Sequence, residues 1–369
     1  MFLGIDISTY FEEKAAGARY FIDGKEVDPL KVFVDNGITH MRIRVWHNPH
    51  DEKGNPYGAG TNDAKEFVRL ADLAVKYGFR IILDIHYSDF WADPGKQFCP
   101  KAWVGLSFEE IEKKVYEHTA ELLNIAKEHN YPIDYVQVGN EITNGMIWPY
   151  GKLDGNTKPR GNYDGLSKLL KSGIKAVRDL SDAKVILHLE KSYDQETYYE
   201  YFTNVIKNGV DFDVIGFSYY PYWHGSMNQL FDNIEMCKKN FHKEVMIVET
   251  GYGFTEEDFI KKGSHAQLMF NTGYINYLGE HMDYKMNKED QVRFIKDILD
   301  RSEKAGVTGV CYWEPLWIPG EGVGWASKYV LPYLGLAPDT SLRNEWANQC
   351  LYDYDGNSLP SLWEFAVKK

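Results

Sequence analysis

Short runs rich in β-branched and aromatic residues alternate with amphipathic helical segments along most of the 369-residue chain. Runs such as Ile81-Ile-Leu-Asp-Ile85 are almost continuously apolar, as expected for strands covered on both faces. The predicted strands are Phe2–Ser8, Thr39–Trp46, Phe79–His86, Tyr135–Asn140, Lys184–Leu189, Asp213–Tyr219, Glu244–Thr250 and Val307–Trp313. The predicted helices between them are Asp28–Asn36, Ala64–Tyr77, Ser107–Glu128, Tyr163–Leu180, Gln195–Lys207, Met227–Asn240 and Lys288–Lys304.

Eight strands with intervening helices predict the α/β class and, within it, a single (β/α)8 TIM barrel over residues 1–369. The alternative is an open doubly wound sheet, but no G-x-G-x-x-G or Walker sequence follows the first strand. Long turn-rich or aromatic loops follow the carboxyl ends of strands, at residues 48–61, 87–101, 251–285 and 315–347. Barrel enzymes carry their active sites at this end.

The net charge limits the partners that the chain can bind. Acidic residues outnumber basic ones by 54 to 41, which gives a formal charge of −13. This balance argues against nucleic-acid and anionic-membrane partners and favours a neutral substrate. Aromatic residues make up 15% of the chain, which suits sugar binding but also a large core.

The sequence contains no run of membrane-span length. It begins Met1-Phe-Leu-Gly-Ile-Asp6, which is already strand-like, so no signal peptide is predicted and the compartment stays open between cytoplasm and secretion. The four cysteines are widely spaced and indicate neither a disulfide framework nor a zinc motif. We expect a monomer.

The predicted strand ending at Gly139-Asn140-Glu141 stops abruptly in an amide and a carboxylate. Glycine at this point permits a close approach of backbone or ligand. For an Asn-Glu pair on its own, a polar turn after a strand is the preferred explanation, so a functional site needs support from the other strand ends.

In a barrel the carboxyl ends of all eight strands meet in one ring, and here the ring is polar, ionisable and aromatic. Each of its members also has a structural explanation, such as a solvated strand end or a satisfied core histidine. Together they predict a functional site at the mouth of the barrel, meaning the opening at the carboxyl ends of the strands. The members are Asp6, Arg42, Arg44, His86, Asn140, Glu141, His188, Glu190, Tyr219, Tyr220, Glu249, Trp313 and Glu314.

Two glutamates, Glu141 and Glu249, end the fourth and seventh predicted strands, which lie on opposite sides of such a mouth. Glycoside hydrolysis needs two carboxyl groups flanking the scissile bond, one as proton donor and one as nucleophile or base. We expect Arg42 and Tyr220 to keep Glu249 ionised, and Glu249 to raise the pKa of Glu141. We expect Asn140 to hold the sugar 2-hydroxyl.

Aromatic residues near the strand ends are candidate sugar platforms. We expect Trp313 to form the floor under a sugar ring, with Glu314 as a support or a hydroxyl contact. Trp91, Trp223 and Trp317 are further candidates, although each of them could instead be packed beneath a loop.

A zinc site is the alternative use of these residues, with His86, His188, Glu141 and Glu249 as ligands. Barrel amidohydrolases carry H-x-H on the first strand, whereas this chain has Asp6-Ile-Ser8. We therefore predict no metal and no cofactor.

Several longer motifs resemble the endo-β-1,4-galactanases of glycoside hydrolase family 53, and the similarity runs from Gly4 to Phe365. The motifs are Arg42-Ile-Arg-Val-Trp46, His86-Tyr-Ser-Asp-Phe-Trp-Ala-Asp-Pro-Gly-Lys-Gln97, Val138-Gly-Asn-Glu-Ile-Thr-Asn-Gly145, Gly216-Phe-Ser-Tyr-Tyr-Pro-Tyr-Trp223, Val248-Glu-Thr250 and Tyr312-Trp-Glu-Pro-Leu-Trp-Ile318.

The resemblance implies a retaining barrel hydrolase with Glu141 as acid/base and Glu249 as nucleophile. It also implies a substrate of β-1,4-linked galactose, as in type I arabinogalactan of pectin, or galacto-oligosaccharides from it. From the shared motifs we add Asp89 to the substrate-binding or supporting residues, which already include His188 from the strand ends. The alternatives are the same mechanism on mannan, xylan or β-glucan, and a non-catalytic sugar-binding barrel.

Two segments depart from the family pattern. The fifth strand ends His188-Leu-Glu-Lys-Ser192 where the family usually has His-Leu-Asp-Asn-Gly, which puts the chain-length preference in question. Some relatives bind calcium after the seventh strand, but Phe259–Phe270 offers few oxygen ligands, so no calcium site is predicted there.

Overall fold

The computed structural model describes residues 1–154, 160–260 and 284–365. Eight parallel strands in this part of the chain close into a barrel in the order β1-β12-β11-β10-β9-β6-β5-β4. The predicted (β/α)8 barrel is confirmed, and each predicted strand is present to within two residues at either end. The strands are β1 (Phe2–Asp6), β4 (His40–Val45), β5 (Arg80–Ile85), β6 (Ile133–Val138), β9 (Lys184–Leu189), β10 (Val214–Tyr219), β11 (Glu244–Thr250) and β12 (Gly309–Trp313).

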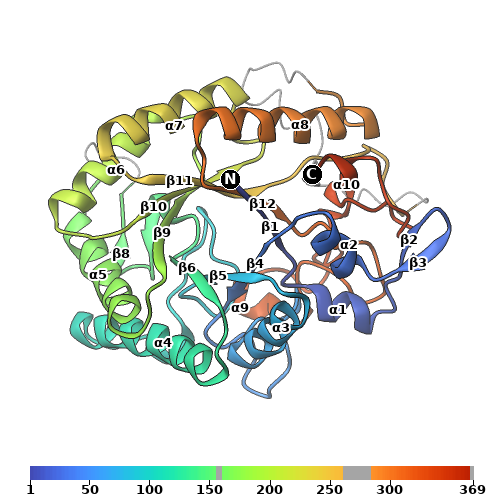
Figure 1. The fold of residues 1–369 in the computed structure, drawn as a ribbon. Coiled ribbons are helices and arrows are strands. Elements are labelled where there is room, and N and C mark those ends of the chain that lie inside the picture. Colours follow the sequence, from blue (N-terminus) through green and yellow to red (C-terminus); the bar gives the residue numbers. More distant parts are fainter. Residues whose placement is uncertain (155–159, 261–283, 366–369) are drawn as a thin grey trace.

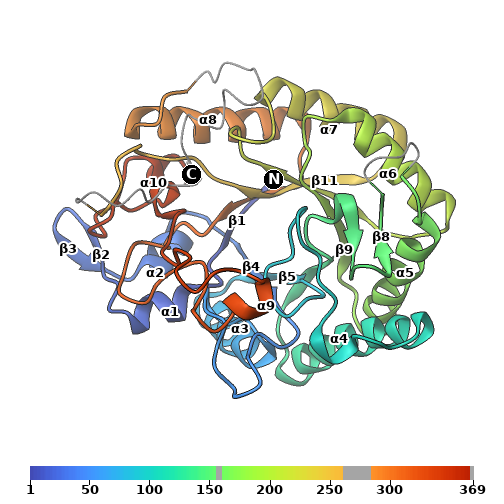
Figure 2. The same ribbon diagram turned by 180° about the vertical axis from the view of Figure 1, so that it is seen from behind.

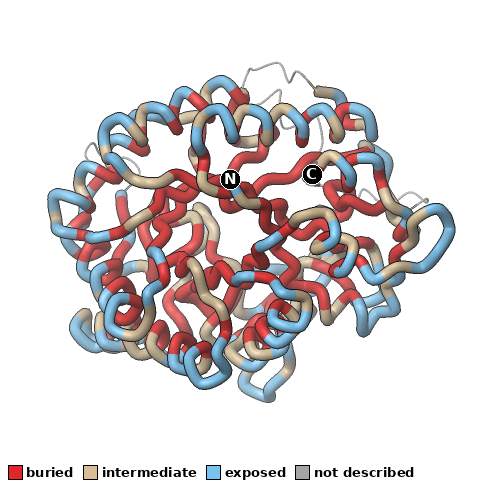
Figure 3. The backbone as a smooth tube through the Cα atoms, viewed as in Figure 1, coloured by how far each residue is buried: buried red, intermediate tan, exposed pale blue. Residues whose placement is uncertain are grey.

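Seven of the described helices wrap the outside of the barrel (Figure 1). Their inner faces are buried and their outer faces exposed, which matches the amphipathic pattern of the sequence (Figure 3). Ser107 begins the longest of them with a capping box that includes Glu110. These helices are α2 (Pro29–Asp35), α3 (Ala64–Tyr77), α4 (Phe108–His129), α5 (Tyr163–Leu180), α6 (Gln195–Lys207), α7 (Met227–Phe241) and α8 (Lys288–Ala305).

The barrel closes at Gly4, which pairs with Cys311 of β12 on one side and His40 of β4 on the other. A Cβ atom at Gly4 would lie 2.8 Å from Cys311 Sγ and 3.3 Å from His40 Cβ. Only glycine therefore allows the first strand to approach both neighbours this closely.

Alternate residues of each strand face the interior of the barrel, and their character changes along the strands. One layer is an apolar cluster of Ile82, Tyr135, Ile186, Val214, Met246, Val248 and Cys311. Further along, the inward positions are Asp84 of β5 and His86, which directly follows the strand, and both are buried. The apolar cluster therefore fills the barrel interior beneath a polar layer at the carboxyl ends of the strands.

Strand β11 contains a β-bulge next to this polar layer. Phe217 of β10 pairs with Ile247, but the next residue, Ser218, pairs with Glu249, so β11 has one residue more than its neighbour. Its pairing with β12 shifts over the same segment. Val248 belongs to the inner apolar cluster and Glu249 lines the cavity at the mouth, so the bulge lets two consecutive residues face inward.

The loops carry short elements that the sequence did not predict. Figure 2 shows α9 and the chain around it in front of the barrel. Most of the predicted loop at 251–285, including much of the Phe259–Phe270 segment considered for calcium, lies outside the described residues. The additional elements are α1 (Tyr10–Ala15), β2 (Tyr20–Ile22), β3 (Lys25–Val27), η1 (Lys101–Trp103), η2 (Ile142–Asn144), β7 (Gly145–Met146), β8 (Gly151–Lys152), α9 (Leu331–Leu334), η4 (Ala347–Gln349) and α10 (Ser361–Glu364).

Membrane insertion of a helix can be assessed for the described part of the chain. None of its helices combines the length and the apolar character needed to cross a bilayer.

Candidate active site

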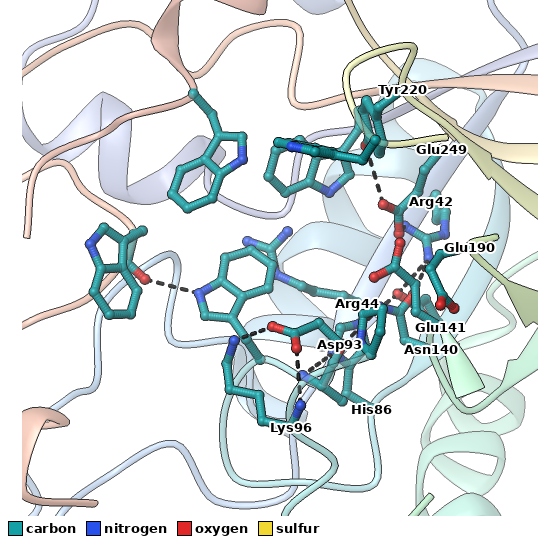
Figure 4. A pocket seen from close by; sticks show the side chains of 18 of the residues that line it. Arg42, Arg44, His86, Asp93, Lys96, Asn140, Glu141, Glu190, Tyr220 and Glu249 are labelled. Carbon is teal, nitrogen blue, oxygen red and sulfur yellow. Dashed lines mark hydrogen bonds and ion pairs between the residues drawn. The ribbon is translucent and has the colours of Figure 1, made fainter. Parts of the chain in front are cut away.

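A cavity of about 370 Å³ opens at the carboxyl ends of the strands (Figure 4). This volume lies within the range of small-molecule sites, which is roughly 300–1,000 Å³. The lining combines charged groups with tryptophan rings. It consists of Arg42, Arg44, Asp84, His86, Trp91, Ala92, Asp93, Pro94, Lys96, Asn140, Glu141, Glu190, Tyr220, Trp223, His224, Glu249, Trp313, Trp325 and Trp346.

Most of the predicted site residues meet in this cavity. Two others, Asp6 and His188, are completely buried beside it, where Asp6 contacts Arg42 and His188 contacts Asn140. The predicted residues that line the cavity are Arg42, Arg44, His86, Trp91, Asn140, Glu141, Glu190, Tyr220, Trp223, Glu249 and Trp313.

The backbone at the end of β6 has an unusual conformation that presents Glu141 to the cavity. Gly139 has a φ of +86°, and Glu141 itself is left-handed, with φ 48° and ψ 51°. A Cβ atom at Gly139 would lie 2.7 Å from Ile142 Cγ2, so this position requires glycine. A left-handed glutamate costs conformational energy, and such strain concentrates at functional sites.

Arg42 is the electrostatic centre of the site. Its guanidinium forms ion pairs with Asp6 at 2.9 Å, Asp84 at 2.8 Å and Glu249 at 2.9 Å. It also donates to Asn140 Oδ1 at 3.0 Å. One buried cation thus neutralises part of the charge of three buried carboxylates and fixes the orientation of Glu249.

Replacing Arg42 by methionine is expected to lower the free energy of unfolding by about 3–5 kcal/mol, since it leaves buried carboxylates without their counter-charge. Urea titration of the variant followed by tryptophan fluorescence measures this change. The matched control is Arg19→Met, because Arg19 pairs with Glu26 on the exposed β2–β3 hairpin. The control should leave the midpoint of the urea titration almost unchanged, because solvent screens an exposed ion pair. Equal effects of the two substitutions would contradict a central role for Arg42.

Glu249 is buried but contacts groups that favour its ionised form. Burial raises the pKa of Glu249 to about 7, although Arg42 opposes this rise and Asp84 and Asp6 add to it. The hydroxyl of Tyr220 donates to Glu249 Oε2 at 3.2 Å and lowers the pKa. The carboxylate therefore has a cation on one oxygen and a donor on the other.

Glu141 holds its proton more firmly than Glu249. Burial, the charge of Glu249 and the charge of Glu190 raise the pKa of Glu141 well above its ordinary value. The hydroxyl of Ser218 donates to Glu141 Oε1 at 2.7 Å and acts in the opposite direction. Since Glu249 carries the cationic partner, it ionises first and Glu141 remains protonated.

The two histidines considered as zinc ligands already have protein partners on both ring nitrogens. His86 Nε2 lies 2.9 Å from Asp84 Oδ2, and its Nδ1 accepts from the Ala92 amide at 3.2 Å. His188 Nδ1 lies 2.9 Å from Asn140 Oδ1, and its Nε2 lies 2.8 Å from Ser218 Oγ. These contacts orient the histidines within the network and do not favour the zinc alternative.

Tryptophan rings form the wall of the cavity that includes Trp313. Trp91 lies 6.0 Å from Trp313, and its indole N–H donates to the Trp325 carbonyl at 2.9 Å. The Arg44 guanidinium stacks on Trp91 at 4.1 Å from the ring centroid. The same arginine pairs with Glu314 at 2.8 Å, and Glu314 is completely buried, so its role is that of a support.

Two predicted site residues lie outside the cavity lining and take the supporting role that was one of their predicted alternatives. Trp317, a candidate sugar platform or a residue packed beneath a loop, has no exposed surface and stacks on Trp346 at 6.0 Å beneath the cavity wall. Asp89 lies outside the cavity lining and accepts hydrogen bonds from the amides of Asn48 and Lys101. Both residues hold loops in place and do not reach the cavity.

Some residues of the cavity were not predicted from the sequence. Asp84 could have been found, because it lies two residues before His86 on the predicted strand Phe79–His86 and so shares its face. The remaining members come from loops in which the sequence has no periodic signal, and they are Ala92, Asp93, Pro94, Lys96, His224, Trp325 and Trp346.

The fold and the cavity together define the class of protein. The protein is a (β/α)8 barrel, and the cavity at the carboxyl ends of its strands contains two carboxyl groups of different proton affinity beside tryptophan rings. This arrangement is that of a glycoside hydrolase. Comparison with known proteins gives the particular family. The chain belongs to glycosyl hydrolase family 53, whose profile matches residues 2–365.

Named relatives and a solved structure agree with this assignment. The endo-beta-1,4-galactanase of Bacillus subtilis (strain 168) is 33% identical, over 98% of this chain and 84% of its own. The arabinogalactan endo-beta-1,4-galactanase of Cellvibrio japonicus is 34% identical, over 86% of this chain and 81% of its own. The structure of the Ignisphaera aggregans GH53 catalytic domain superposes with a TM-score of 0.86 at 35% identity, and it covers 98% of this chain and 94% of that one.

Proposed function

We propose that this protein is a retaining endo-β-1,4-galactanase in which Glu249 is the nucleophile and Glu141 the acid/base. One observation carries the assignment of roles. Glu141 and Glu249 line the same cavity, but only Glu249 has the Arg42 ion pair, at 2.9 Å. Unequal partners give the two carboxyl groups the unequal proton affinities that the mechanism needs.

In the first step the Glu249 carboxylate attacks the anomeric carbon and forms a glycosyl ester. Glu141 gives its proton to the glycosidic oxygen, whose bond to that carbon breaks, and the leaving sugar departs as an alcohol. Asn140, held by Arg42 on its carbonyl oxygen, lies beside both groups, where its amide can contact the 2-hydroxyl.

In the second step Glu141, now a carboxylate, removes a proton from water while the oxygen attacks the anomeric carbon. The ester bond to Glu249 breaks, and the sugar is released with its original β configuration. Both steps use only carboxyl groups and water, so the proposal includes no cofactor.

The proposed substrate is a neutral galactan chain or an oligosaccharide derived from it. The galactanase relatives support this choice of sugar. The cavity supports a neutral polymer, because its acidic side chains Asp93, Glu190 and Glu249 would repel a polyuronate. The tryptophan rings supply the apolar faces on which sugars stack.

A panel of polysaccharides tests the assignment of substrate. Galactan, mannan, xylan and β-glucan are incubated with the protein, and new reducing ends are measured. Release from galactan alone is the expected result, and proton NMR of the first product should show the β anomer. New reducing ends from another polymer would assign that polymer as the substrate. Binding of galactan without new reducing ends would favour a non-catalytic sugar-binding barrel.

The hydroxyl of Ser218 gives a pH-dependent prediction. Its hydrogen bond lowers the pKa of Glu141, so Ser218→Ala should raise that pKa further. Because Glu141 must be protonated in the first step, the alkaline limb of the kcat/KM profile should move to higher pH. The acid limb, which reports ionisation of Glu249, should stay in place.

The control for this prediction is Ser302→Ala, because Ser302 is buried on α8, far from the barrel mouth. The pH profile of the control should match that of the wild type. A shift of the alkaline limb of Ser218→Ala to lower pH would contradict the role given to Glu141.

A further inference from the structure

Gln97 is a buried polar residue of the loop at residues 87–101 that the two proposed steps do not use. It is 3% exposed and does not belong to the cavity lining, so a substrate does not touch it. Its side-chain amide donates to the carbonyl oxygen of Asn140 at 2.8 Å and to that of Glu141 at 3.3 Å. The carbonyl of Asp93, in the same loop, is a third acceptor at 3.2 Å. These hydrogen bonds join the loop to the backbone of the proposed acid/base.

The backbone that Gln97 contacts is the left-handed segment after β6. Glu141 has a φ of 48°, and a residue persists in this conformation only where its surroundings hold it there. The Glu141 amide donates to His188 Nδ1 at 3.4 Å, and the carbonyls on both sides of that residue accept from Gln97. Because a peptide group is planar, holding the two peptide groups that flank Glu141 sets the direction of its Cα–Cβ bond.

Other hydrogen bonds connect the same two segments of the chain. The side-chain amide of Asn140 donates to the Ala92 carbonyl at 2.9 Å, and the Trp148 backbone amide donates to the Gln97 carbonyl at 2.7 Å. These two bonds fasten the loop to the segment after β6, but they do not involve the backbone of Glu141. The contact with that backbone is made by the Gln97 side chain.

The position of a general acid matters because it must lie within hydrogen-bond reach of the oxygen that it protonates. A displacement of about 1 Å can lower a rate by about 10²-fold. Glu249 takes its position from other residues, Arg42 and Tyr220. A change at Gln97 should therefore act on the acid/base and not on the nucleophile.

We propose that Gln97 is the positioning residue of the acid/base. By binding the Asn140 and Glu141 carbonyls, it holds the Glu141 carboxyl within reach of the glycosidic oxygen in the first step and of water in the second. This inference rests on the proposed function and adds to it a residue that the substrate does not touch.

The test compares two substrates in Gln97→Met, which keeps the length of the side chain but has no N–H to donate. One is β-1,4-galactotetraose, whose leaving sugar needs the proton of Glu141. The other is β-galactobiosyl fluoride, because fluoride leaves with little help from a proton donor. For the tetraose, kcat/KM should fall by about 10- to 100-fold, since a displaced acid loses much of its contribution to the rate. For the fluoride, kcat/KM includes only the steps up to the glycosyl ester and should change by less than about threefold.

The fluoride provides a second measurement. Glu141 is also the base of the second step, so hydrolysis of the ester should slow and kcat for the fluoride should fall by about 10-fold or more. KM for the fluoride should fall in nearly the same proportion. A general loss of structure would lower kcat/KM for both substrates and would not separate kcat from kcat/KM in this way.

Gln291→Met is the matched control. Gln291 is buried on α8, and its side-chain amide also donates to three backbone carbonyls, those of Tyr252 at 2.7 Å, Cys350 at 3.1 Å and Gln349 at 3.3 Å. The control should lower the midpoint of a urea titration to a similar extent as Gln97→Met. It should keep the wild-type ratio between the kcat/KM values of the two substrates.

Gln97→Asn is the conservative variant, because it keeps the amide and withdraws it by one methylene. Its kcat/KM for the tetraose should lie between those of the wild type and Gln97→Met, with the fluoride unchanged. If Gln97→Met does not fold, the ratio measured for Gln97→Asn decides the question.

Equal losses of kcat/KM on the two substrates, or a wild-type ratio in the Gln97 variants, would overturn the role of Gln97 and leave the proposed function intact. If the wild type hydrolyses neither substrate, the proposed function fails and this inference falls with it.

Discussion

Glu249→Ala is expected to lower kcat on galactan by about 10⁴-fold or more, the order of loss when a covalent nucleophile is removed. The carboxylate lies 2.9 Å from Arg42, and no other cavity glutamate has that ion pair. Azide should restore turnover of β-galactobiosyl fluoride, because the small anion fits the space left by the carboxylate. The product should be the α-glycosyl azide, formed by one direct displacement.

Mass spectrometry and proton NMR of the azide product measure this outcome. Glu244→Gln, on the same strand at the far end of the barrel, is the control and should keep wild-type activity. Retention of more than a few per cent of activity by Glu249→Ala, or formation of a β-azide, would contradict the assignment of the nucleophile.

Glu141→Ala is expected to lower kcat on galactan by about 10²- to 10⁴-fold, the usual contribution of general acid–base catalysis. The loss on β-galactobiosyl fluoride should be smaller for the first step, since fluoride leaves with little help from a proton donor. The glycosyl ester on Glu249 should then accumulate, because Glu141 is also the base that activates water.

Two measurements separate this variant from the previous one. Mass spectrometry should detect the galactobiosyl ester on Glu249, and azide should give the β-glycosyl azide by attack on that ester. The alkaline limb of the pH profile, which reports the proton of Glu141, should disappear. An α-glycosyl azide from Glu141→Ala would mean that Glu141 is the nucleophile and Glu249 the acid/base.

The barrel could be predicted from the sequence because its signals are periodic and repeated. Helix α3 has the predicted bounds, Ala64–Tyr77, since its apolar spacing is flanked by Asp63 as a cap and Gly78 in the left-handed conformation. The hairpin of β2 and β3 was missed. Each of its strands has three residues, too few for a period to be recognised.

Site residues could be predicted where the position along a strand determines which way a side chain points. They could not be predicted where the packing of loops decides whether a side chain reaches the cavity. Glu141, Glu249 and Arg42 followed from strand ends that converge in any barrel. Trp317 and Trp313 are four residues apart and look equivalent in the sequence, yet only Trp313 lines the cavity. Nothing in the sequence says which tryptophan another loop covers, because that depends on long-range contacts such as the stacking of Trp317 on Trp346.

The bulge in β11 has a consequence for the design of barrels of this type. Current design practice starts from regular strands of matched length. Rebuilding β11 as a regular strand would keep Val248 in the interior and turn Glu249 toward the helices, where it would be a buried carboxylate without Arg42. A regularised barrel with every catalytic residue type retained would therefore be inert. A design must therefore retain the extra residue of β11 together with the side chains whose direction it determines.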